Sequence, residues 1–496
     1  MTTEERKVRD FGLIFYLWFL VVLAAYAFGV YAIYDFIISG QGAIDWIVGK
    51  AQGLNLSELE SYVIANPTIK NWIFGGIAIL FVLGIIIAFI EVWFMSYFGA
   101  EIVTGTIFGM PLLLIGAGVF SLIWFDQKWI GAAMLVPAAF LIVIVLLVAR
   151  RVVLGAKIFE TSCEAVNENK RTLLPILFFA IMSIITFALG TSASVWVGLN
   201  IGNILSESSK WVQMLVFFVV IYVFLAIYWT TLYFTDAINI CIYKRWNNYK
   251  DASIRIAIRE IWKIKGSIVL FGMFMAFFDW LIKIVQYFAA KKIKETSRFF
   301  KFWSIAKKVL YVIFFIFIIL LRWLFKILKF LNYYTLTIIV VEKQGFIKSI
   351  VRSSDLALDS GADIIIGKTG VGIAKGLFSA MTLSIFAVGG FFAGYYWLGL
   401  EITGSLTDVA MFGVAVAILF FFFGYLPMTA ILRPISTAYK TILFYYITDP
   451  FRGKPGRRTR LSKDIQESVT KVRERVMETY DKEDRPTWTK PEESVS

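Results

Sequence analysis

The sequence contains no histidine and only two cysteines among its 496 residues. Histidine is the commonest general base and metal ligand near neutral pH, so its absence excludes Ser-His-Asp triads, zincin sites and haem ligated by histidine. We expect Cys163 and Cys241 near the cytoplasmic face and therefore predict no disulfide and no thiolate metal site. No nucleophile and base are arranged for catalysis. We expect a protein that is not an enzyme and needs no cofactor.

Charged residues are also scarce. They make up only 17% of the chain, whereas 59% of residues are hydrophobic and the mean hydropathy is +0.75. Many apolar runs exceed the roughly 20 residues that cross a bilayer as a helix. The pattern predicts an all-α, polytopic transmembrane helical bundle. About ten spans are expected, at 12–38, 72–98, 105–125, 129–149, 173–198, 212–241, 267–289, 309–341, 370–398 and 407–448.

The distribution of lysine and arginine predicts the orientation. Basic residues gather in 150–172, 243–265, 343–368 and the tail, whereas 199–210 and 399–407 carry almost none. The bias places both termini of a cell-membrane protein in the cytoplasm. The net charge of +14 then belongs mainly to a surface that faces anionic lipid headgroups. Nucleic acid is not an expected partner, because no recognition motif accompanies the charge. Homo-oligomerisation and partner subunits stay open.

One pattern occurs three times along the chain: a short amphipathic helix with basic residues leads into a long hydrophobic run. We call these the elbow helices, and they are expected at 155–171, 251–265 and 345–359, roughly 95 residues apart. Such helices are expected to lie in the headgroup plane. We predict a four-span block over 1–150, a repeated elbow-hairpin domain over 151–450, and a cytoplasmic basic tail with a short amphipathic helix over 451–496.

Ionisable residues inside the hydrocarbon region are costly and are therefore candidates for function. Asp279 and Lys283 are spaced i and i+4 on span seven, so they share one face and can neutralise each other. They form either a polar site between spans six to eight or a purely structural ion pair. The full candidate set for a solute site or polar network is Asp279, Lys283, Gln286, Asp236, Asn239, Arg322 and Glu91. A different role, close helix packing, is expected for Gly367, Gly370, Gly372 and Gly376.

Several segments carry a family resemblance. Residues 152–450 resemble a family of prokaryotic polytopic membrane proteins known as a domain of unknown function, through ETSCEAVNENKRTLLPILF, YFTDAINICIYKRW, VVEKQGFIKSIVRSS and TAYKTILFYYIT. That family commonly has proline just before the glutamate, where this chain has Ile339-Val340-Val341.

A second, weaker resemblance is to the choline transporter-like family. It rests on GSIVLFGMFMAFFDWLIKIVQYF, LFKILKFLNYY and ISTAYKTILFYYITD, and implies transport of a small cationic alcohol. The large cysteine-bearing external loop of that family is absent from the first 150 residues. The sequence as a whole predicts a transporter or permease for a small solute. The alternative is a non-catalytic scaffold or assembly factor that binds partners or lipids through its elbow helices.

Overall fold

The computed structural model describes residues 12–38, 67–124, 128–204, 210–248, 250–298, 316, 319–320, 323–359, 361–395 and 406–448. Every regular element in these ranges is helical, which confirms the predicted all-α class. In chain order the elements are α1 (Gly12–Ile38), α4 (Pro67–Trp124), α5 (Lys128–Glu168), the 3-10 turn Lys170–Thr172, α6 (Leu173–Ile204), α7 (Lys210–Asn247), α8 (Ile254–Trp262), α9 (Lys265–Arg298), α11 (Thr335–Val341), α12 (Phe346–Asp359), α13 (Gly361–Phe392) and α15 (Leu406–Thr448). A further helical stretch covers 323–331.

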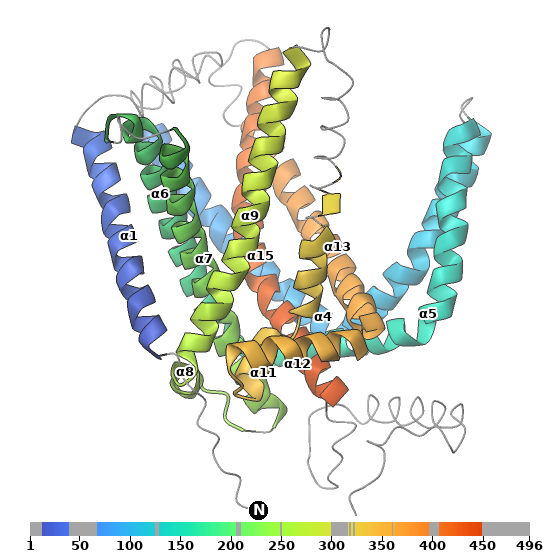
Figure 1. The fold of residues 1–496 in the computed structure, drawn as a ribbon. Helices are drawn as coiled ribbons and strands as arrows, with labels where there is room; N and C mark the ends of the chain where they lie inside the picture. Colours follow the sequence, from blue (N-terminus) through green and yellow to red (C-terminus); the bar gives the residue numbers. More distant parts are fainter. Residues whose placement is uncertain are drawn as a thin grey trace, which may run out of the picture. The chain divides into compact units, whose positions relative to one another are not determined.

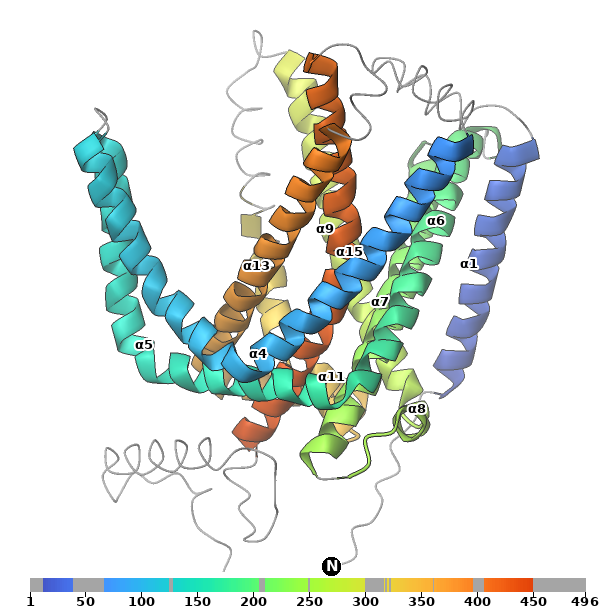
Figure 2. The same ribbon diagram turned by 180° about the vertical axis from the view of Figure 1, so that it is seen from behind.

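The described residues contain six segments that are long and apolar enough to cross a membrane. They lie in α1, α4, α6, α7, α9 and residues 323–341. The polytopic character is therefore confirmed, whereas the number of ten spans stays a prediction. The expected spans 72–98 and 105–125 are parts of one 58-residue helix, α4. Figure 2 shows that α4 bends between two limbs. Pro111 and several glycines lie in its interior, and such residues are common causes of helix bends.

The chain divides into two compact units, and each is assembled from separate stretches of sequence. The first contains residues 1–66, 177–241 and 255–359, and the second contains 67–176, 242–254 and 360–496. The first unit therefore holds α1, α8, α9, α11, α12 and most of α6 and α7. The second holds α4, α5, α13 and α15. The sequence-based division at residues 150 and 450 stays a prediction.

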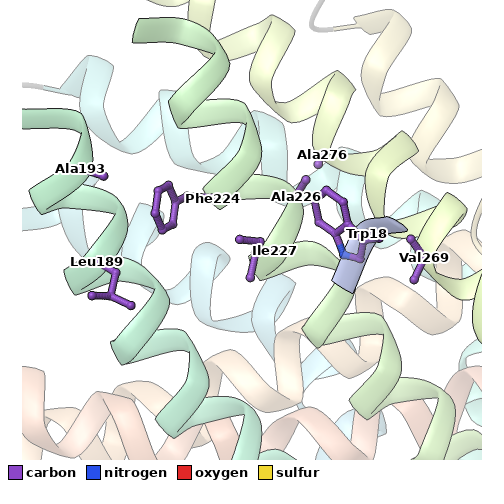
Figure 3. Close-up of a cluster of buried hydrophobic side chains, with 8 residues drawn as sticks. All are labelled: Trp18, Leu189, Ala193, Phe224, Ala226, Ile227, Val269 and Ala276. Atoms are coloured by element: carbon purple, nitrogen blue, oxygen red, sulfur yellow. The ribbon is translucent and has the colours of Figure 1, made fainter. Parts of the chain in front are cut away.

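The first unit is built around apolar side chains from four helices (Figure 3). Trp18 of α1 belongs to this cluster. Its indole nitrogen also donates a hydrogen bond of 3.3 Å to Thr230 Oγ1 on α7. The other members of the cluster are Leu189 and Ala193 on α6, Phe224, Ala226 and Ile227 on α7, and Val269 and Ala276 on α9. Burial of these side chains joins helices that are more than 200 residues apart in sequence.

Glycine permits the closest approaches between helices of this unit. A Cβ atom on Gly29 of α1 would lie 2.7 Å from the Leu189 Cβ on α6, and one on Gly272 of α9 would lie 2.8 Å from the Thr230 Cα on α7. Polar contacts support α1 as well. The hydroxyls of Tyr26 and Thr186 lie 2.6 Å apart.

The second unit packs α4 along α5 and α13 along α15 (Figure 1). The glycines that allow the second contact are Gly390 and Gly394, whose Cβ positions would lie 2.7 Å from Phe420 and 2.8 Å from Val416. The sequence predicted close helix packing at glycines nearer the start of α13. For Gly372 and Gly376 this prediction is wrong. Among the described residues, nothing lies within 4 Å of a Cβ built on either glycine.

The first elbow helix differs from its prediction. It is not separate but forms the last part of α5, and its apolar residues Ile158, Phe159, Cys163 and Val166 are buried. A Cβ on Gly99 of α4 would lie 3.3 Å from the Phe159 ring, so this segment packs on protein. Its apolar face is therefore unavailable to lipid.

The other two elbow helices form largely as expected, as α8 and α12. Figure 1 shows α12 running crosswise to α9. Each keeps apolar residues on its surface. Ile258 and Trp262 are exposed on α8, and Ile347, Val351 and Leu358 are exposed on α12. This is the surface required of a helix that lies at the boundary of a bilayer.

The close contact at Gly272 leads to a stability prediction. We expect Gly272→Val to lower the free energy of unfolding by about 1–3 kcal/mol, because the new side chain would force α9 away from the α7 backbone. Gly389→Val in α13 is the matched control, since its Cβ would meet nothing within 4 Å in the described part of the chain. Thermal melting in detergent measures both. Equal melting temperatures for the two variants would contradict the predicted contact.

Candidate functional site

The predicted pair Asp279 and Lys283 lies on α9 with 3.4 Å between Asp279 Oδ2 and Lys283 Nζ. The two side chains are 23% and 55% exposed, so the pair is not sealed inside a dry core. A third group comes from α7. The indole nitrogen of Trp229 donates a hydrogen bond of 3.4 Å to Asp279 Oδ2. The carboxylate thus joins α7 to α9 within the first unit.

Trp229 begins a chain of aromatic contacts across three helices. Its ring stacks on Tyr233, one turn along α7, with 5.5 Å between centroids. Tyr233 contacts Phe271 of α9 at 4.5 Å. Phe271 in turn lies 6.4 Å from Phe346 at the start of α12. Aromatic contacts therefore connect the neighbourhood of Asp279 to an elbow helix.

A cation lies against this aromatic group. The ammonium of Lys329, in the helical stretch 323–331, is 4.4 Å from the ring centroid of Phe325 and 5.7 Å from that of Trp229. Both distances are within the range of cation–π attraction. The arrangement therefore offers two aromatic faces to a positive charge and places a carboxylate at the edge of one of them. We refer to Trp229, Phe325, Lys329 and Asp279 as the aromatic cation site.

Asp236 and Asn239 occupy α7 on the C-terminal side of this site. Asp236 is 7% exposed and follows Trp229 and Tyr233 at helical spacing on one face. Asn239 is fully buried, and neither its Oδ1 nor its Nδ2 has a hydrogen-bond partner among the described residues. Burial of an amide without partners is costly.

The remaining sequence candidates lie elsewhere. Glu91 belongs to α4 in the second unit, where it is 7% exposed. Its Oε1 accepts a hydrogen bond from the Thr382 hydroxyl on α13, and its Oε2 is buried without a partner in the described part of the chain. Arg322 lies outside the described residues, as does the side chain of Gln286.

Sequence reasoning identified the i, i+4 pair but missed its aromatic neighbours. It expected Asp236 and Asn239 to support the pair from span six, whereas the hydrogen bond from that helix comes from Trp229. Aromatic residues make up 17% of the chain, so composition alone does not single out Trp229 or Phe325. Phe325 is four residues before Lys329 on one helical stretch, so the spacing could have revealed that contact, whereas only the folded arrangement brings Trp229 to Lys329.

Comparison with known proteins bears on the two family resemblances. A family model described as "Plasma-membrane choline transporter" matches residues 132–451, which is more than half of the chain. A search of curated proteins found no match. The weaker resemblance is therefore confirmed, and nothing found supports the resemblance to the prokaryotic family. The match contains every residue of the aromatic cation site.

The Glu91 contact gives a prediction for the second unit. We expect Thr382→Val to lower the free energy of unfolding by about 1–3 kcal/mol, because it removes the donor to a buried carboxyl group. Thr448→Val is the control. Its hydroxyl donates a hydrogen bond to a carbonyl of its own helix, and the residue is partly exposed. Thermal melting of the purified protein measures the difference, and an unchanged melting temperature for Thr382→Val would refute the role of this bond.

Proposed function

The chain belongs to the choline transporter family, and from this premise we propose that it carries a small organic cation of the choline type across the membrane. Its several apolar helices make it a multi-pass membrane protein. The observation that carries the proposal is the placement of the Lys329 ammonium over the Trp229 and Phe325 rings.

This placement suits a quaternary ammonium ion because such an ion cannot donate hydrogen bonds. It is attracted instead by aromatic faces and by a negative charge nearby. Trp229 and Phe325 supply the faces, and Asp279 supplies the charge. In the proposed site the Lys329 ammonium occupies the position of the substrate cation and leaves it when substrate enters.

Asp279 has a second use in the proposal. An isolated carboxylate inside a membrane protein is unfavourable, so an empty site needs another cation to balance it. Lys283 supplies that charge at 3.4 Å. When the substrate cation arrives, Asp279 can exchange Lys283 for it with little change in net charge. Because Lys283 is 55% exposed, its side chain has room to move aside.

The alcohol group of the substrate needs hydrogen-bonding partners along its path. In the proposal Asp236 and Asn239 provide them on the side of α7 toward the elbow helices. The amide of Asn239 is buried without partners among the described residues, so it is suited to form a hydrogen bond with the hydroxyl group of the substrate. Asp279 lies 14 residues after Lys265, about 20 Å along α9 from the end beside α8.

Uptake of radiolabelled choline into proteoliposomes tests the proposal. We expect Trp229→Ala to raise KM roughly 3-fold to 30-fold, the range of a cation–π contact, and Trp229→Phe to have a smaller effect. Asp279→Asn is expected to lower uptake because it removes the charge that balances the substrate. The neutral analogue 3,3-dimethylbutanol should fail to compete, since it has the shape of choline without its charge.

Two control variants exclude general damage. Trp323→Ala removes an exposed tryptophan near the same site, and Asp355→Asn removes an exposed carboxylate of α12. Both are expected to transport choline normally. If Trp229→Ala and Asp279→Asn transport as well as these controls do, Asp279 and Lys283 form only a structural ion pair and the site assignment is wrong.

A further inference from the structure

A basic pocket of about 660 Å³ lies where α8 meets the start of α1 and the start of α9. Its lining contains four cationic side chains, Arg255, Arg259, Lys263 and Lys265. No carboxylate of the described chain lines it. All of these residues belong to the first unit. Among the described residues, the pocket therefore concentrates positive charge.

Lys265 lines this pocket, and its ammonium group is held in place by its neighbours. Its ammonium donates a hydrogen bond of 3.0 Å to the Tyr16 hydroxyl on α1. It also lies over the rings of Phe15, Tyr16 and Trp262, at 4.9, 4.3 and 4.8 Å from their centroids. The residue is only 5% exposed. This positive charge is held in place by neutral aromatic groups, so it stays available to attract an anion.

One face of α8 supplies most of the remaining lining. The residues of this face follow the spacing i, i+3, i+4, i+7 and i+8, and they are Arg255, Ile258, Arg259, Trp262 and Lys263. The opposite side of the helix is buried through Ala257 and Ile261. Cations and apolar side chains therefore alternate on the exposed face, and Ile258 and Trp262 are 45% and 53% exposed.

We propose that this pocket binds the phosphate-bearing headgroup of an anionic phospholipid. The four cations attract the negative charge of a phosphate diester, and arginine suits phosphate because its planar group can donate two parallel hydrogen bonds. A small soluble anion would use only the cations. The exposed Ile258 and Trp262 favour a lipid, because they can contact the glycerol backbone and the beginning of the acyl chains. Tryptophan is enriched at this depth of membranes for the same reason.

Binding at this place has a mechanical consequence. Tyr16 belongs to α1, the arginines belong to α8 and Lys265 begins α9, so one headgroup contacts all three helices. A bound lipid would hold α1 against α9. Lipid binding should therefore raise the thermal stability of the whole protein, independently of whether any solute is transported.

The test uses the full chain purified in a neutral detergent and phosphatidylglycerol with a fluorescent label as the probe. Unlabelled phosphatidylglycerol is expected to displace the label, whereas phosphatidylcholine and inorganic phosphate are not. The double variant Arg255→Gln/Arg259→Gln should raise the Kd of the probe roughly tenfold or more, because each basic residue near an anionic lipid surface contributes to binding. Phosphatidylglycerol should also raise the melting temperature of the unsubstituted chain but not that of this variant.

Two further variants separate the pocket from general effects. Arg171→Gln/Lys348→Gln removes the same amount of charge at exposed positions outside the pocket and should leave the Kd unchanged. Ile258→Asn keeps every cation but removes an apolar contact. It should therefore raise the Kd of the lipid probe without altering the melting temperature of the lipid-free protein. The proposal is overturned if the two double variants bind alike, or if inorganic phosphate displaces the probe as well as phosphatidylglycerol does. The latter result would indicate a soluble anion. An acidic peptide that displaces the probe better than the lipid would indicate a protein partner instead.

Discussion

The structure depends on one constraint: the hydrocarbon region of a bilayer offers no water to backbone or side-chain polar groups. Helices satisfy the backbone within each segment, which accounts for a described chain made only of helical elements. Polar side chains must then find partners in the protein. Trp18 with Thr230, Tyr26 with Thr186 and Thr382 with Glu91 are such pairs, and each joins helices distant in sequence. A few polar pairs therefore add to the apolar cluster and the glycine contacts in joining these helices.

The same constraint shapes the positive charges of the first unit. Lys265 and Lys329 both lie against aromatic rings, which attract a cation without needing a negative partner. The consequences differ because their surroundings differ. Lys265 is enclosed and adjoins other cations, an arrangement that favours an anion. Lys329 is exposed beside an aromatic pair and a carboxylate, an arrangement that favours exchange with another cation.

Family membership and geometry support the proposed function by separate routes. The family match rests on the sequence of residues 132–451. The contacts of Trp229, Phe325 and Asp279 concern one location, where α7, α9 and the helical stretch 323–331 meet. Both routes support the proposal of a small organic cation, because aromatic faces and a carboxylate are groups that attract a quaternary ammonium ion.

The sequence by itself determined the features that arise within single helices. These are the membrane class, the second and third elbow helices, and the ion pair of Asp279 and Lys283, because periodicity and i, i+4 spacing are local properties. Only the tertiary structure decided which distant groups meet. It buried the first elbow helix against α4, brought Trp229 to Asp279, and placed Lys329 over the Trp229 ring, 100 residues away in sequence. Burial and cation–π attraction depend on the relative positions of helices, and no repeat or spacing within one segment encodes them.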